Sequence, residues 1–169
     1  MTRNIINTSG VLLVFCLLAV AAPKPNFGGT WVMDRGRSFG LPGNMQQTMT
    51  VSQTEGQIEV ETKLIQPDNE RTVKDTYLLD GKEHEFTPLS PPNTPPNTTP
   101  PKGKRIAAWL PKGNGIVVTE VTTNETPKGT VTTQVMKKWT LTADGELTVD
   151  MYIDNPSVSY ESKRIFTKK

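Results

Sequence analysis

The chain has 169 residues, a net charge of +2, one cysteine and one histidine. This length fits one domain, and the charges alternate in sign without a basic block that would favour nucleic acid or an anionic membrane surface. The single cysteine excludes an intrachain disulfide framework and a cysteine-based metal site.

The first 21 residues have the pattern of a signal peptide. Arg3 gives a positive start, residues 11–20 form an apolar run, and small residues at Ala19 and Ala21 offer a cleavage site. The run is shorter than the roughly 20 apolar residues that a spanning helix needs. We therefore expect cleavage after Ala21 and a secreted or periplasmic domain of residues 22–169 without a membrane span. Retention of the segment as an uncleaved anchor is the alternative.

The mature chain shows a hydrophobic period of two, which is typical of strands with one buried face. In residues 57–64, Ile58, Val60 and Leu64 alternate with charged or polar side chains. Strands are expected at 28–34, 46–53, 57–66, 70–79, 82–87, 104–110, 115–123, 130–141, 146–154 and 158–167. Glycine-containing turns separate many of them: Glu55-Gly56, Asp80-Gly81, Asn114-Gly115, Lys128-Gly129 and Asp144-Gly145. The pattern predicts an all-β fold, a single antiparallel up-and-down barrel of about 8–10 strands.

Two segments depart from this pattern. Residues 34–44 are rich in glycine around Phe39, and we expect a loop or a single helical turn over one mouth of the barrel. Residues 88–101 are rich in proline, which cannot donate a ladder hydrogen bond, and are expected to form a disordered loop. That loop is either a solvated insertion or a polyproline ligand for a partner domain.

Gly29-x-Trp31 resembles the Gly-x-Trp signature of lipocalins. A closer resemblance, over nearly the whole mature chain, is to exported bacterial lipocalin-like (calycin-type) β-barrel proteins, most of them without an assigned function. It rests on residues 27–31, 77–83, 107–109, 138–149 and Phe166. The resemblance implies a barrel that Gly29 and Trp31 close at its base, with Arg164 of the last strand packed across the indole ring. It implies no catalytic residue.

The residue types needed for catalysis or metal binding are sparse. His84 is the only histidine, and alternation along a strand separates it from Glu83 and Glu85, so the three ligands of a catalytic zinc are lacking there. Glu59 and Glu61 lie on a wet strand face, which disfavours acid–base chemistry. We therefore expect no catalytic residue, no metal and no cofactor, and a protein that is not an enzyme.

An interior pocket is the remaining expectation for function. The candidate ligand-binding residues are Tyr77, Trp109, Val118, Thr133, Lys137, Trp139 and Met151. Lys137, together with Arg105, falls on a parity that could point inward and suit an acidic head group. The prediction is an exported barrel that binds a small hydrophobic or amphiphilic ligand. The alternative is a non-catalytic envelope interaction or structural module with a filled core and an unidentified protein partner.

Overall fold

The computed structural model describes residues 23–41, 43–67, 69–88, 101–126 and 129–169. The predicted signal peptide 1–21 lies outside these residues, as do positions 89–100 of the predicted proline-rich loop. Within the described residues, all regular structure is β-strand, which confirms the all-β prediction. No helix in these ranges is long and apolar enough to cross a membrane.

Ten strands form one antiparallel sheet, and they follow the expected positions closely. They are β1 (Gly29–Phe39), β2 (Gln46–Gln53), β3 (Gln57–Gln66), β4 (Asn69–Leu78), β5 (Glu83–Phe86), β6 (Lys102–Trp109), β7 (Gly115–Thr126), β8 (Gly129–Leu141), β9 (Leu147–Asn155) and β10 (Val158–Lys168). Their order in the sheet is β4-β3-β2-β1-β10-β9-β8-β7-β6-β5. The pairing of β1 with β10 joins the two ends of the chain in the middle of the sheet.

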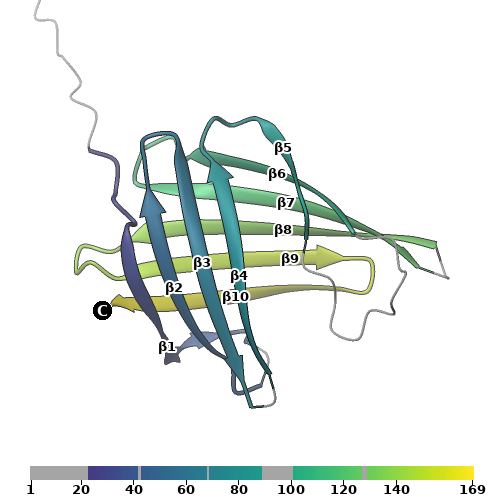
Figure 1. Cartoon of the computed structure of the whole chain (residues 1–169), viewed down its shortest axis with the longest axis horizontal. Helices are drawn as coiled ribbons and strands as arrows, with labels where there is room; N and C mark the ends of the chain where they lie inside the picture. Colours follow the sequence, from purple (N-terminus) through teal and green to yellow (C-terminus); the bar gives the residue numbers. More distant parts are fainter. Residues whose placement is uncertain (1–22, 42, 68, 89–100, 127–128) are drawn as a thin grey trace, which may run out of the picture.

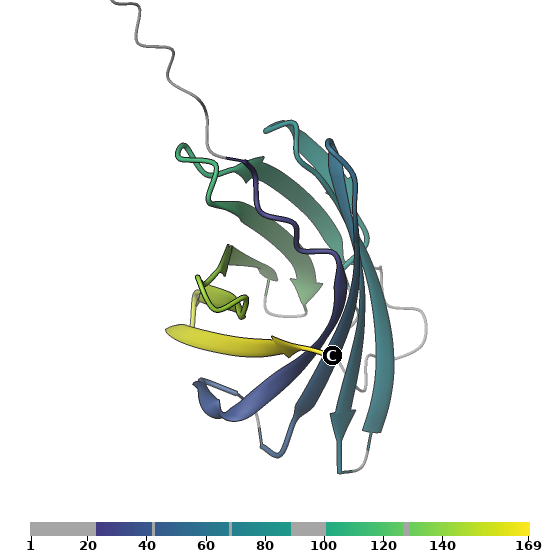
Figure 2. The ribbon, with the colours of Figure 1, turned by 90° about the vertical axis from the view of Figure 1, so that its left-hand side faces the viewer.

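The sheet curls into a half-barrel. In Figure 1, β2, β3 and β4 run steeply across the front, whereas β6 to β9 run nearly at right angles to them behind. Figure 2 shows the same sheet end-on, with the two halves facing each other across an interior. The order of pairing ends at β4 and β5, so among the described residues no backbone ladder closes the curl. Side chains at this seam therefore matter for holding the two edges together.

Alternation decides which side chains enter the interior. On β3, Ile58 and Val60 are 0% and 3% exposed, whereas Glu59 and Glu61 between and beside them face solvent. Successive side chains of a strand point to opposite faces, so the sequence pattern maps directly onto the inside and outside of the curl. The same parity places Trp139, Val149 and Phe166 in the core.

The segment 34–44 differs from the expected loop or helical turn. Strand β1 continues to Phe39, with a register shift against β10 between Asp34 and Phe39. The hydroxyl of Ser38 takes part in this irregularity, since it accepts a hydrogen bond from the backbone N–H of Ile165 at 3.0 Å and donates to the carbonyl of Asp34 at 2.6 Å. The Ser38 hydroxyl thus takes the place of a backbone hydrogen bond between β1 and β10. The residues inserted at the register shift can therefore remain part of the strand.

Trp31, which the family resemblance implies at the base of the barrel, is a core residue, and the cation over its ring is Lys168 and not the predicted Arg164. Trp31 is 1% exposed, and its indole N–H donates to the carbonyl of Phe27 at 2.7 Å. Lys168 lies over the ring, with its Nζ 5.4 Å from the centroid, because the ladder places Lys168 opposite Trp31. Gly29 has a φ of +130°, which favours glycine, and a Cβ there would displace the end of the Lys168 side chain. Arg164 pairs with Val149 further along β10, and its guanidinium donates to Gln47 instead.

Candidate ligand-binding cavity

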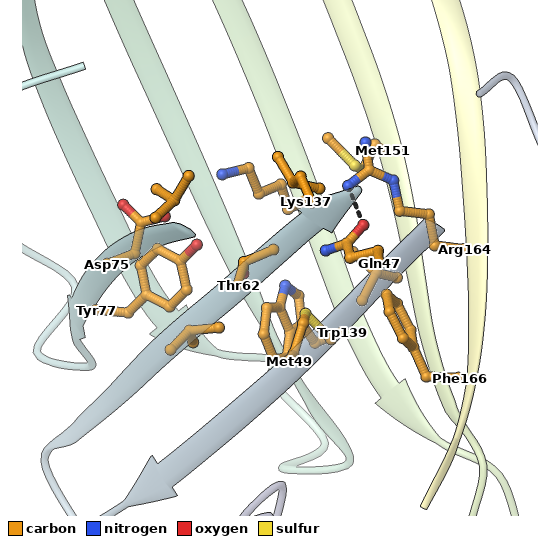
Figure 3. A pocket seen from close by; sticks show the side chains of 14 residues that line it. Gln47, Met49, Thr62, Asp75, Tyr77, Lys137, Trp139, Met151, Arg164 and Phe166 are labelled. Atoms are coloured by element: carbon orange, nitrogen blue, oxygen red, sulfur yellow. Dashed lines mark hydrogen bonds between the residues drawn. The ribbon is translucent and has the colours of Figure 1, made fainter. Parts of the chain in front are cut away.

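A cavity of about 170 Å³ lies inside the curl, between β2, β3 and β4 on one side and β8, β9 and β10 on the other. Figure 3 shows side chains from both halves of the sheet converging on it. The sheet therefore leaves space at the point where its two halves face each other.

Four of the predicted ligand-binding residues line this cavity: Tyr77, Lys137, Trp139 and Met151. Each belongs to a strand whose inward parity was readable from the sequence. Other lining residues supply an apolar wall, namely Met49, Val60, Leu64, Val149 and Phe166. Met49 and Val60 are each 3% exposed, so this wall is part of the core.

The other three predicted residues do not line the cavity. Val118 is 0% exposed and is a core residue. Trp109 stacks on Phe27 with ring centroids 6.4 Å apart and has the Nζ of Lys24 above its ring at 4.9 Å. Thr133 pairs with Thr122 in the β7–β8 hairpin, which extends past its neighbouring strands in Figure 1. The alternation of side chains predicts which residues face inward. It does not predict which inward residues line the cavity, because that also depends on their position along the strand.

A buried ionic network occupies the seam end of the interior. The guanidinium of Arg105 contacts Asp75 at 2.6 Å and Glu120 at 2.7 Å, and the Nζ of Lys137 contacts the second oxygen of Glu120 at 2.8 Å. The same guanidinium donates to the carbonyl of Thr76 at 3.1 Å, and so joins β6 to β4 across the seam. The two cations and two carboxylates of this network balance one another.

Burial and ion pairing oppose each other within this network. Burial lowers the pKa of Lys137, but nearby Tyr77 and Glu120 favour the charged ammonium and make the net shift upward. Burial is also the largest single influence on the pKa of Arg105 and lowers it, but Glu120, Tyr77 and Asp75 together raise this pKa by more. Burial also raises the pKa of the Tyr77 hydroxyl, despite the lowering effect of Lys137. The expectation that Lys137 and Arg105 point inward is correct, yet both already have carboxylate partners.

Arg164 is a half-buried cation on the inner face of β10 that does not take part in this network. Its Nη1 donates to Oε1 of Gln47 at 2.7 Å, and its Nε is buried without a hydrogen-bond partner. Within the described ranges, no carboxylate forms an ion pair with it. Burial lowers its pKa, as it does for a cation that lacks a compensating anion.

Several residues of this site were missed by the sequence predictions. Arg164 was expected at the base of the barrel, and Gln47, Asp75 and Glu120 were not singled out. The signal was present in the alternation, since Arg164 shares its parity with buried Phe166, and Asp75 with buried Tyr77. A polar residue at an inward-facing position is easily taken for a solvent-exposed one, because the sequence pattern does not show the partner with which it forms a hydrogen bond or an ion pair.

His84 is remote from the cavity. Its Nε2 lies 3.0 Å from Asp80 Oδ1 on an exposed surface. The part of the chain that the structure describes contains no group of three or more histidine, cysteine, aspartate or glutamate residues placed to hold a metal ion.

Comparison with protein-family models finds no match, and comparison with curated protein sequences finds none either. Among solved structures, the chain is similar to secretory abundant heat soluble protein 4 from Ramazzottius varieornatus. The sequence identity is 15%, the TM-score is 0.46, and the alignment covers 84% of this chain and 94% of that chain. A similarity at this level carries no argument about the ligand, activity or family of this chain.

Proposed function

We propose that this protein is a non-catalytic binding protein that holds a small apolar or amphiphilic molecule in the interior cavity. The observation that carries the proposal is the cavity itself, about 170 Å³ of space with a largely apolar wall inside an otherwise packed sheet. Preformed apolar pockets with a few polar groups are the usual form of small-molecule sites.

The apolar wall supplies a driving force for binding. The cavity is partly open to solvent, and wall residues such as Leu64 and Met151 are half-buried. A ligand that covered these side chains would remove apolar surface from water, at about 25 cal/mol per Å².

The size of the cavity limits the ligand. Sites for drug-sized molecules commonly have about 300–1,000 Å³, whereas this cavity has about 170 Å³. The ligand is therefore a small molecule, such as one with a short alkyl chain, rather than a long-chain lipid enclosed over its full length.

The test is a titration with hexan-1-ol, followed by nuclear magnetic resonance of the three tryptophan indole N–H groups. Trp139 lines the cavity, whereas Trp31 and Trp109 do not, so only the Trp139 signal should shift in a saturable way. A cavity-filling variant, Val60→Phe, should abolish that shift while the folded spectrum is kept. No saturable shift in the unaltered protein, or an equal shift in Val60→Phe, would contradict the proposal and favour a structural or interaction module.

The proposal includes export. Its support is the signal-peptide pattern of residues 1–21. Expression of the full chain in a bacterial host, followed by fractionation and N-terminal sequencing, should give a protein that begins at Ala22 in the periplasm or medium. Recovery of the uncleaved chain in the membrane fraction would show an anchor instead.

A further inference from the structure

Arg164 lies on the inward face of β10 and reaches into the cavity from the strand that also supplies Phe166. Figure 3 shows its guanidinium directed toward Gln47, whose amide nitrogen faces the cavity. Gln47 is 5% exposed, whereas Arg164 is half-buried with its Nε fully buried. The two side chains form a polar site within an apolar surround. Partial removal of a charged group from water without an ionic partner costs free energy, so this site needs an explanation.

The charges of the interior leave Arg164 uncompensated. The cavity and the seam network together contain three cations and two carboxylates: Arg105, Lys137, Arg164, Asp75 and Glu120. The ion pairs of Asp75 and Glu120 all go to Arg105 and Lys137, at 2.6–2.8 Å. Gln47 is neutral and satisfies one N–H of Arg164 without balancing its charge. The interior of the described chain therefore carries one surplus positive charge.

Two buried N–H donors that border the cavity have no hydrogen-bond acceptor in the described chain. The Nε of Arg164 and the Nε1 of Trp139 are both buried and have no hydrogen-bond partner in the described chain. Trp139 is 2% exposed, and Figure 3 shows its indole nitrogen directed into the cavity. Buried donors are nearly always paired in folded proteins. An ordered water would satisfy a donor, but it would leave the surplus charge unbalanced.

We propose that the ligand is a monocarboxylate with a short apolar tail, and that Arg164 takes its carboxylate. This rests on the proposed function of the cavity. One negative charge balances the one surplus positive charge, and the planar guanidinium of arginine matches the two oxygens of a carboxylate. The tail lies along the apolar wall that includes Met49, Met151 and Phe166. Lys137 and Arg105, which the sequence suggested for an acidic head group, instead hold the two interior carboxylates.

The test compares two probes of matched length, hexanoate and hexan-1-ol, by isothermal titration calorimetry at neutral pH. The variants are Arg164→Met, which removes the interior charge, and Lys163→Met, which removes a charge from the outward-facing neighbour on the same strand. Lys163 is 39% exposed at its side chain and has only a long contact, 3.7 Å, with Asp150, so it is a matched control. Circular dichroism and thermal unfolding establish that each variant is folded.

The proposal expects hexanoate to bind the unaltered protein at least about tenfold more tightly than hexan-1-ol, as for a hydrogen-bonded charged group. Arg164→Met should lose about tenfold or more in hexanoate affinity and keep its hexan-1-ol affinity, whereas Lys163→Met should change neither. Arg164→Lys, which keeps the charge, should retain part of the hexanoate affinity.

The outcomes separate this inference from the proposed function. Binding of hexan-1-ol as tightly as hexanoate, or equal hexanoate affinity in Arg164→Met and the unaltered protein, would overturn the role of Arg164 and leave the cavity function standing. Acetate that binds as tightly as hexanoate would overturn the apolar tail. Failure of both hexanoate and hexan-1-ol to bind would overturn the cavity function and, with it, the carboxylate ligand.

Discussion

Substitution of Arg105 by methionine should destabilise the protein strongly, because this side chain links the two edges of the open sheet. Arg105 is on β6, and it donates to Asp75 and to the carbonyl of Thr76 on β4 at 2.6 and 3.1 Å. It also lies above the rings of Tyr77 and Phe86, at 4.6 and 4.1 Å from their centroids. Methionine keeps much of the packing volume and removes the charge and the donors.

The expected loss of unfolding free energy depends on which ion pairs remain after Arg105 is replaced. Glu120 would keep its contact with Lys137 at 2.8 Å, whereas Asp75 would lose its ionic partner. Removing one partner of a buried ion pair costs about 3–5 kcal/mol. The Asp75 side chain is 24% exposed, so water relieves part of this cost and we expect the lower end, about 3 kcal/mol. With an m-value of about 2 kcal/mol/M, the urea midpoint should fall by about 1.5 M.

The assay is urea unfolding followed by circular dichroism, with Lys104→Met as the control. Lys104 neighbours Arg105 but faces solvent, and it pairs with Glu83 through side chains that are 59% and 53% exposed. Exposed pairs contribute about 0–1 kcal/mol, so this variant should lie close to the unaltered protein. A difference of less than about 1 kcal/mol between the two variants would refute the view that the network holds the seam.

Two further changes probe β1 and the sheet interior. Arg37 lowers the pKa values of Asp34 and Glu146 by hydrogen bonding, below their ordinary values of 3.8 and 4.5. The contribution of these contacts to stability is therefore present above the ordinary pKa values. It is lost as the pH falls through the lowered pKa values, because the carboxylates become protonated. The stability difference between the unaltered protein and Arg37→Gln should therefore shrink below about pH 4 in urea unfolding, and a difference that grew there would contradict this. Gly115→Ala would place a Cβ 2.3 Å from a backbone carbonyl oxygen and should cost about 1–3 kcal/mol by the same measurement, whereas Gly56→Ala meets nothing within 4 Å and should cost less than about 1 kcal/mol.

The strand pattern was predictable because it depends on neighbouring residues. Alternation of apolar and polar side chains marks each strand, and glycine turns such as Asp144-Gly145 mark the breaks between them. The prediction was wrong for the segment from Asp34 to Phe39, since its glycine content suggested a loop. A hydroxyl from Ser38 to the neighbouring strand keeps that segment in the sheet, and such a contact has no signature in local sequence.

The all-β fold, the expected strands and the inward parity of residues such as Tyr77 and Trp139 were predictable, because they follow from a period of two and from turn residues. Which inward residues meet depends instead on contacts between distant strands. Arg105 and Asp75 are 30 positions apart, and Arg164 and Gln47 are 117 apart. Curling of the sheet sets which levels of the strands face one another. For this reason Arg105 meets a carboxylate, whereas Arg164 meets none among the residues that the structure describes.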